Sequence, residues 1–280
     1  MKSILITGTS TGIGKACALL LDSLGYQVIA GVRKNSDGEA LKAQSSSRLA
    51  PLILDITDMN SIADAVQIME SNSDNQLSAL VNNAGIAFRG PLEYIPVIDF
   101  RKQLEVNLIG QLALTQACMP LLRSGQGRIL FIGSASGRLP PPFLGPYAVA
   151  KSGLEMVSNT LRLELRPWGL HVSILICGSV VTPIWQHATN TAHDLSQSLP
   201  PTGQQQYQAN IEASNVFYDS LGHEGLPADV VARKVARILT VRNPRSCYLV
   251  GKDAWIYTFI IRFFPTFVRE WITLREMRLT

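Results

Sequence analysis

Cysteine is scarce in this chain of 280 residues, and the few cysteines are scattered. The four of them form neither a C-x-x-C pair nor a cluster with histidine: Cys17, Cys118, Cys177 and Cys247. Zinc sites need ligands at short fixed spacings, and small disulfide scaffolds are dense in cysteine. We therefore expect no metal site and no disulfide framework, but free thiols in a reducing compartment.

Concentrated charge and long apolar runs are also missing. Lysine and arginine number 25 against 21 for aspartate and glutamate, with no basic cluster, which argues against a nucleic-acid partner. No apolar run approaches the ~20 residues that a membrane-spanning helix needs. A strand pattern begins at Ser3, which leaves no room for a signal peptide. These absences predict a cytoplasmic protein.

Short apolar runs alternate with helical patterns along the chain. The runs typical of buried strands are Ser3–Thr7, Gln27–Val32, Pro51–Leu54, Ala79–Val81, Arg128–Ile132, His171–Ile176 and Cys247–Val250. The helical patterns between them are Gly12–Leu24, Met59–Ser71, Asp99–Arg123, Gly145–Arg166 and Pro227–Leu239. The alternation predicts an α/β fold, a Rossmann-like doubly wound parallel sheet of about seven strands with helices on both faces. With no repeat and no linker, residues 1–280 are expected to form one domain.

Residues 183–225 depart from this alternation. The segment is a long excursion between the last two predicted strands, and its middle is polar and interrupted by Pro200 and Pro201. Long connections inside compact domains are usually functional. We therefore interpret the segment as a lid.

The turn after the first predicted strand is rich in glycine, with the sequence T-G-T-S-T-G-I-G at Thr7–Gly14. On its own such a turn is often only a tight loop. Here it follows a strand and opens a helix, so its glycines let the backbone approach a pyrophosphate at the helix N-terminus. The turn therefore predicts dinucleotide binding.

Tyr147 and Lys151 are four residues apart in a predicted helix, so they share one face, with roughly 5–6 Å between their Cβ atoms. A phenol titrates near ~10 in water, and a neighbouring ammonium pulls its pKa toward neutrality. Such a tyrosine exchanges a proton with a substrate oxygen. The alternative is an ordinary pair on a helix surface.

Five features occur together in one order. They are the glycine-rich Thr7–Gly14, the sequence N-N-A-G at Asn82–Gly85, then Asn107, Ser134 and the Tyr147/Lys151 pair. This combination resembles the short-chain dehydrogenase/reductase family, in particular its hydroxysteroid and retinol dehydrogenase branch. The resemblance extends from Met1 to Val241. It implies a dinucleotide-binding catalytic domain that acts as an NAD(P)-dependent alcohol dehydrogenase or carbonyl reductase.

The resemblance assigns four catalytic residues: Asn107, Ser134, Tyr147 and Lys151. It implies that Tyr147 exchanges a proton with the substrate oxygen and that Ser134 orients this oxygen. Lys151 would lower the pKa of Tyr147 and bind the nicotinamide ribose. Asn107 would hold a water that replaces the proton; its alternative interpretation is a hydrogen-bonded amide in the core. Ser136 is expected to be structural.

The resemblance also implies a set of cofactor-binding residues: Gly8, Ser10, Thr11, Gly12, Ile13, Gly14, Arg33, Asp55, Ile56, Asn83, Ala84, Gly85, Tyr147, Lys151, Val180 and Thr182. Within it, Asn83–Gly85 would line the adenosine side and Asp55 would bind adenine, although both segments also suit turns. After the sixth predicted strand, Cys177 stands where the family usually has proline. Thr182 keeps the expected contact with the carboxamide, and Cys177 is expected to be buried and inert. The alternative is a thiol placed near the cofactor.

The end of the second predicted strand suggests which cofactor is bound. An NAD enzyme usually has a carboxylate there for the ribose 2′-hydroxyl, whereas this chain has Val32 followed by Arg33 and Lys34. A guanidinium suits a 2′-phosphate, so NADP(H) is favoured over NAD(H). The alternative is an exposed basic turn.

These residues predict an oxidoreductase that interconverts a lipophilic secondary alcohol and a ketone or aldehyde, a small-molecule substrate. Two alternatives are a nucleotide-sensing protein without turnover and a sugar epimerase or dehydratase. By the resemblance we also expect a homodimer or homotetramer.

The tail, residues 253–280, has an amphipathic helical pattern rich in aromatic residues, which Pro265 should divide. We predict that Phe259, Phe263 and Phe267 are buried against the lid or a neighbouring subunit. Peripheral contact with a membrane, with the arginines at the headgroups, is the second hypothesis.

Overall fold

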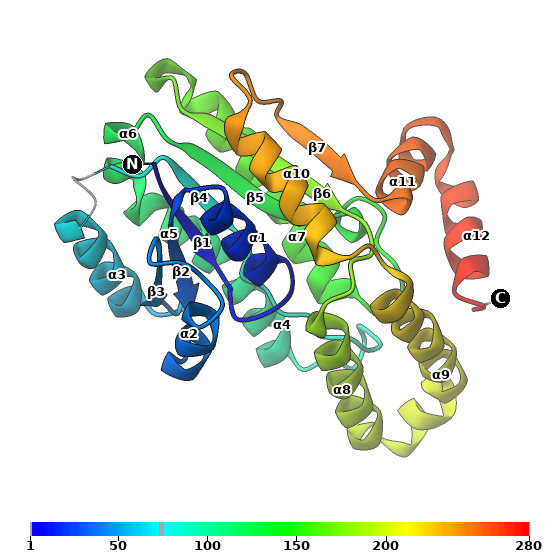
Figure 1. Ribbon diagram of the computed structural model, residues 1–280. Helices are drawn as coiled ribbons and strands as arrows, with labels where there is room; N and C mark the ends of the chain where they lie inside the picture. Colours follow the sequence, from blue (N-terminus) through cyan, green and yellow to red (C-terminus); the bar gives the residue numbers. More distant parts are fainter. Residues whose placement is uncertain (1, 73–75, 280) are drawn as a thin grey trace.

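The computed structural model describes residues 2–72 and 76–279. In these ranges seven strands form one parallel sheet in the order β3-β2-β1-β4-β5-β6-β7 (Figure 1). Their bounds are β1 Ser3–Thr7, β2 Gln27–Val32, β3 Leu49–Ile53, β4 Ala79–Asn82, β5 Arg128–Ser134, β6 His171–Cys177 and β7 Cys247–Val250. The predicted doubly wound α/β fold is confirmed. The strand order changes direction between β1 and β4, the place where such sheets bind ligands.

Helices cover both faces of the sheet, and an apolar core lies under each layer. One core contains side chains of α1 (Gly12–Ser23), α2 (Asn35–Lys42) and α10 (Ala228–Thr240), and α1 and α10 lie side by side across the sheet in Figure 1. The other contains side chains of α3 (Met59–Asn72), α5 (Gly110–Ala117), α6 (Met119–Ser124) and α7 (Gly145–Glu164). The buried strands are apolar on both sides because both of their faces are covered.

The helix predicted at Asp99–Arg123 is divided in the structure. It consists of α4 (Val97–Leu104), a π-helical turn at Glu105–Ile109, then α5 and α6. The π-helical turn widens the helix at Asn107, and such turns are frequent at functional sites. The separate α6 begins at Met119, with Pro120 in its first turn, where a residue without a backbone N–H is tolerated.

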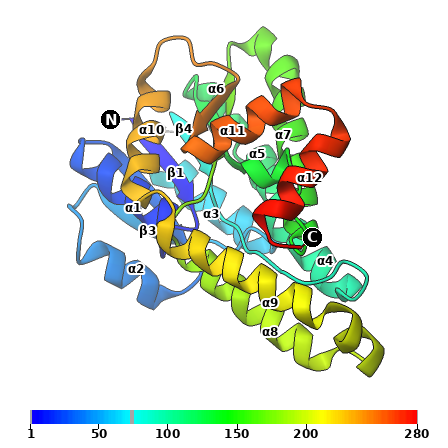
Figure 2. The same ribbon diagram turned by 90° about the vertical axis from the view of Figure 1, so that its right-hand side faces the viewer.

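Residues 183–225 form two antiparallel helices rather than an irregular loop. These are α8 (Pro183–Ser198) and α9 (Pro201–Glu224), which pack against each other and project from the domain (Figure 2). Pro200 and Pro201 lie at the start of α9, where proline suits the first helical turn. The polarity of this segment reflects two helices with one face in solvent.

The tail forms α11 (Lys252–Phe263) and α12 (Thr266–Glu276), divided at Pro265 as predicted. However, Phe259, Phe263 and Phe267 are 56%, 63% and 71% exposed, so the prediction that they pack against residues 183–225 is wrong. The tail reaches this segment at its other end, where Met277 packs with Tyr218 of α9. Among the described residues, no helix is long and apolar enough to cross a membrane.

Candidate active site

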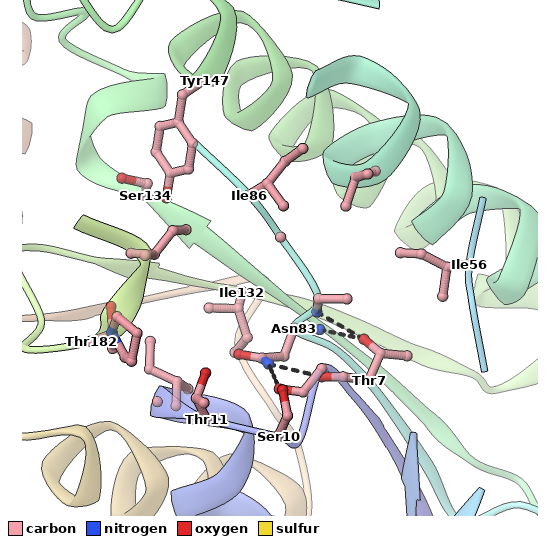
Figure 3. A pocket seen from close by; sticks show the side chains of 18 of the residues that line it. Thr7, Ser10, Thr11, Ile56, Asn83, Ile86, Ile132, Ser134, Tyr147 and Thr182 are labelled. Atoms are coloured by element: carbon pink, nitrogen blue, oxygen red, sulfur yellow. Dashed lines mark hydrogen bonds between the residues drawn. The ribbon is translucent and has the colours of Figure 1, made fainter. Parts of the chain in front are cut away.

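A cavity of about 670 Å³ lies at the carboxyl ends of the strands, beside the point where the strand order changes direction. Its wall contains residues that follow β1, β2, β4, β5 and β6. Figure 3 shows that Ser134 and Tyr147 lie at one end of it, and Thr7 and Ser10 at the other. The predicted site residues that line it are Gly8, Ser10, Thr11, Gly12, Ile13, Arg33, Asp55, Ile56, Asn83, Ala84, Gly85, Ser134, Tyr147, Lys151, Val180 and Thr182. Gly14 and Asn107 are not part of the wall.

The glycine-rich turn has a shape that other residues do not adopt easily. Gly8 and Gly12 have φ values of +67° and +56°. A Cβ on Gly8 would lie 2.9 Å from the Cα of Ala84, and a Cβ on Gly14 would lie 2.2 Å from the carbonyl oxygen of Gly8. Gly14 therefore acts by letting helix α1 approach the turn closely.

Asn83 holds this turn against the end of β4. Its Nδ2 donates to the carbonyl oxygens of Thr7 at 2.8 Å and Gly8 at 3.2 Å. In return, the Oγ1 of Thr7 accepts hydrogen bonds from the backbone N–H groups of Asn83 and Ala84, both at 2.9 Å (Figure 3). Thr7 was not among the predicted site residues, although it is the first residue of the T-G-x-x-x-G-I-G motif.

The N-terminus of α1 faces this cavity and suits the pyrophosphate of a dinucleotide. Within the described residues, the side chain of Thr11 makes no capping hydrogen bond and the first turn of α1 carries no acidic side chain. The backbone N–H groups of this turn and the positive end of the helix dipole therefore remain for an anion. The glycines leave the space that a phosphate needs.

Tyr147 and Lys151 lie one turn apart on α7, and both are buried. Tyr147 points from α7 toward Ser134 at the end of β5 (Figure 3). Burial raises the pKa of Tyr147 to about 12, and its hydrogen bond with Ser134 lowers the pKa only in part. The predicted fall of this pKa toward neutrality is therefore wrong for this structure. The Nζ of Lys151 lies 5.7 Å from the centre of the Tyr147 ring, too far to outweigh burial.

The side-chain nitrogen of Lys151 is held by a hydrogen bond, and its pKa is lower than that of an ordinary lysine. Its Nζ donates to the carbonyl oxygen of Ile132 at 2.7 Å. Burial lowers the pKa of Lys151 to about 8, which places it close to neutral pH. A group in this range exchanges protons readily at working pH.

Asn107 lies behind the cavity wall, in the π-helical turn, and clamps the chain after β4. Its Oδ1 accepts from the backbone N–H of Ile86 and its Nδ2 donates to the carbonyl oxygen of Ile86, both at 2.9 Å. Gln103 and Gln111, four residues before and after it, bond the same segment at Phe88, Ile86 and Ala84. The structure therefore agrees with the alternative interpretation of Asn107, a hydrogen-bonded amide in the core. Gln103 and Gln111 were not predicted. The sequence signal that could have found them is the repeat of amide side chains every four residues, which places all three on one helix face.

Asp253 at the start of α11 holds the turn after β6. Its carboxylate accepts from the backbone N–H of Ser179 at 2.5 Å and from that of Ala254 at 3.0 Å. A Cβ on Gly178 would lie 1.7 Å from Oδ1 of Asp253, so only glycine fits there. The carboxylate thus fixes the turn in which Cys177 replaces proline. This contact spans 74 residues, and no local pattern predicts it.

Cys177 is buried below this turn. Burial raises the pKa of its thiol to about 12, so the thiol stays protonated at neutral pH. A buried, protonated thiol is unreactive. The structure therefore agrees with the prediction of an inert cysteine.

Arg33 and Asp55 lie at the outer end of the cavity. Arg33 is exposed, while Oδ1 of Asp55 accepts from the backbone N–H of Thr57 at 2.9 Å and from its hydroxyl at 2.7 Å. Partial burial raises the pKa of Asp55, but the bonds from Thr57 and the charge of Arg33 outweigh it and hold the pKa below its usual value. Asp55 follows the end of β3 by two residues. Three further charged side chains line the cavity and were not predicted: Arg101, Lys102 and Glu105.

Arg89 anchors the α8–α9 pair beside the catalytic end. It is 2% exposed and lies 3.8 Å above the ring of Tyr218. Its guanidinium donates to Thr189, Ser214 and Asn215. Burial lowers the pKa of Arg89 to about 10, so it stays charged at neutral pH. These bonds fix the base of α8 and α9 on the domain.

A model of the short chain dehydrogenase family matches residues 2–193. The chain belongs to the short-chain dehydrogenase/reductase family. It is 34% identical to 17-beta-hydroxysteroid dehydrogenase type 6 of Bos taurus, over 98% of this chain and 88% of the relative. It is 35% identical to retinol dehydrogenase 5 of Mus musculus, over 90% and 81%. A short chain dehydrogenase from Burkholderia cenocepacia, solved in complex with NADP, has the same fold, with a TM-score of 0.73 at 22% identity over 99% of both chains.

The family and the site agree with each other. The chain is an NAD(P)-binding oxidoreductase of the type that acts on alcohols and carbonyl compounds. The cavity has the groups that this chemistry needs, with an anion site at one end and a serine, a tyrosine and a lysine at the other.

Proposed function

We propose that this enzyme uses NADP(H) to interconvert a lipophilic secondary alcohol and the corresponding ketone or aldehyde. One observation carries the proposal: Ser134, Tyr147 and Lys151 meet at the end of the dinucleotide cavity, beside an apolar compartment. Trp185 and Tyr218 of that compartment lie in the same buried cluster as Tyr147.

A bound nicotinamide supplies or accepts the hydride at the substrate carbon. In reduction, Tyr147 donates its proton to the substrate oxygen, and its pKa of about 12 keeps this proton in place until then. The Oγ of Ser134 accepts from the backbone N–H of Ser136 at 3.2 Å, and its hydroxyl bonds Tyr147, so a substrate oxygen that enters between the two side chains can accept from both. Ser136 thus has the structural role expected of it.

Lys151 completes the proton path. Its positive charge stabilises the phenolate that Tyr147 becomes, and its pKa of about 8 lets it return a proton to the phenolate. We assign the water-holding role to Asn107 as part of the proposal, since Ile86, which its amide fixes, lines the cavity.

The preference for NADP(H) rests on the end of β2. Val32 is buried there and offers no carboxylate, and Arg33 lies exposed at the mouth with Arg101 and Lys102. Arg33 directly follows β2, so its guanidinium is placed to attract a 2′-phosphate, and no carboxylate stands at the end of β2 to repel it. Arg101 and Lys102, which also line the cavity, are matched in number by the acidic Asp55 and Glu105.

The lipophilic substrate is supported by the compartment and by the relatives. The side chains around the catalytic end are apolar or aromatic: Leu144, Trp185, Phe217, Tyr218 and Met277. Relatives at 34% and 35% identity carry the names of hydroxysteroid and retinol dehydrogenases. These names also favour an oxidoreductase over a nucleotide sensor or a sugar epimerase.

A kinetic screen tests the proposal. Purified enzyme is assayed with NADPH and NADH against steroid, retinoid and alkyl ketones and against small water-soluble ketones. We expect reduction with NADPH and a kcat/KM that rises with apolar surface. An enzyme that binds NADPH but turns over none of these ketones, nor the matching alcohols with NADP⁺, would contradict it.

We include peripheral membrane contact in the proposal. The exposed aromatic side chains of the tail lie on α11, α12 and the turn between them: Trp255, Phe259, Phe263, Phe264, Phe267 and Trp271. Arg262 and Arg275 are exposed beside them and suit anionic headgroups, whereas Arg269 bonds the carbonyl oxygens of Ile261 and Phe264. A homodimer or homotetramer stays a prediction.

A further inference from the structure

A second, small cavity lies beyond the catalytic pair, on the side of the C-terminal helices. Its volume is about 40 Å³, and it shares Ser134, Cys177, Gly178 and Trp185 with the large cavity. Its far wall is formed by α9, α11 and α12. The small cavity therefore offers one path by which a substrate whose oxygen reaches Ser134 could extend toward the end of the chain.

Met277 closes this small cavity. It follows the last turn of α12, is 1% exposed, and belongs to the same buried cluster as Tyr147 and Trp185. One water needs roughly 10–15 Å³ of such space, so the cavity has room for only a few waters. A carbon skeleton must therefore displace a side chain. Met277 suits this because methionine has a flexible, unbranched side chain and lies here near the end of the chain.

The outer end of this compartment is polar and negatively charged. The hydroxyl of Tyr257 on α11 donates to the carboxylate of Glu276 on α12, at 2.9 Å to Oε1 and 3.0 Å to Oε2. Among the described residues that line the cavity, the charged ones are Asp253 and Glu276, both acidic. Asp253 already accepts two backbone hydrogen bonds. Glu276 is exposed on its outer side and keeps capacity to accept another hydrogen bond.

We propose that Met277, Tyr257 and Glu276 form a distal subsite that selects long, uncharged substrates with a hydroxyl group at the end remote from the reacting carbonyl. Met277 sets the length, because a longer carbon skeleton must push it aside. Glu276 accepts the hydrogen bond of the remote hydroxyl and repels a carboxylate in the same place. This inference rests on the proposed function and specifies the substrate class of the same site.

The experiment compares three series of probes in the full-length enzyme with NADPH. They are straight-chain methyl ketones of increasing length, the same ketones with a terminal hydroxyl, and the same ketones with a terminal carboxylate. The variants are Glu276→Gln, Tyr257→Phe, Met277→Ala and Met277→Leu. Glu270→Gln is the matched control, since Glu270 is exposed on the same helix and does not line the cavity.

In the wild type, the terminal hydroxyl should raise kcat/KM above that of the plain ketone by about tenfold, or about 1.4 kcal/mol, and the carboxylate should lower it. Glu276→Gln should relax the exclusion of the carboxylate, and Glu270→Gln should not. Met277→Ala should extend the accepted length, while Met277→Leu, of similar volume, should keep the wild-type limit.

An active wild type that treats the three end groups alike would overturn the subsite but leave the proposed function intact. Unchanged length selectivity in Met277→Ala would overturn the role of Met277. If Met277→Ala does not fold, Met277→Phe supplies the opposite test, since a larger side chain should shorten the accepted length. A wild type without activity on any probe would count against the proposed function itself.

Discussion

The two ends of the active site are built in different ways. At the cofactor end, backbone groups and glycines form the wall, and hydrogen bonds that Asn83 and Ala84 donate to Thr7 fix it. At the substrate end, side chains from α8, from α9 and from the segment after α12 share one buried cluster with Tyr147. A nucleotide has the same phosphates in every enzyme, so a rigid backbone site suits it, whereas substrates differ and side chains adapt to them. Substitutions at the cofactor end should therefore act by displacing the backbone and its hydrogen bonds. Substitutions at the substrate end should act by changing how the side chains pack.

Tyr147 lies where the two ends of the site meet, and its replacement should have the largest effect on catalysis. Tyr147→Phe removes only the transferable proton, so kcat should fall on the order of 10²–10⁴-fold. Cofactor affinity, measured by fluorescence titration with NADPH, should stay close to the wild type. Tyr26→Phe, a change distant from the cavity, is the control. Retention of more than about a tenth of the wild-type rate would mean that Tyr147 is not the proton donor.

Asp253 connects the two ends, because α11 of the tail fixes the turn that lines the cofactor cavity. Asp253→Ala leaves the N–H of Ser179 without its partner, and loss of a hydrogen bond to a charged group destabilises by about 1.5–3 kcal/mol. We expect a lower Tm and a higher KM for NADPH. Asp253→Asn keeps an accepting oxygen, so its Tm and its KM for NADPH should lie between those of the wild type and of Asp253→Ala. If Asp253→Ala changes neither quantity, the tail does not support the cofactor end.

The cofactor end itself is tested at Arg33. Arg33→Ala should raise the KM for NADPH about tenfold, the equivalent of ~1.4 kcal/mol, with little change for NADH, since only NADPH carries the 2′-phosphate. Val32→Asp should shift the preference toward NADH. Lys34→Ala is the control, because Lys34 is exposed and does not line the cavity. A wild type that already prefers NADH would refute the interpretation of Val32 and Arg33.

This difference between the ends also explains what could be predicted from the sequence. The fold and the cofactor wall follow from local patterns, since each strand is an apolar run and Thr7–Gly14 is contiguous. The hydrogen bond of Asp253 with Ser179, and the buried cluster that holds both Met277 and Tyr147, join residues far apart in the chain, so no local spacing predicts them. The pKa of Tyr147 was predicted in the wrong direction, because adjacency to Lys151 is visible in the sequence and burial is not.

The exposed tail should show the smallest effect on catalysis. Phe263 and Phe267 flank the turn between α11 and α12, are 63% and 71% exposed, and have no part in either cavity. Replacing both with serine should leave kcat/KM for a small soluble ketone unchanged but reduce flotation with anionic liposomes, because the apolar side chains no longer insert beside the arginines. Val216→Ser, a change at a side chain 66% exposed on α9, is the control for loss of surface apolarity. Flotation equal to the wild type would exclude membrane contact at this turn. A smaller mass in solution without a change in flotation would instead assign these phenylalanines to a subunit interface, and the tail would then serve assembly.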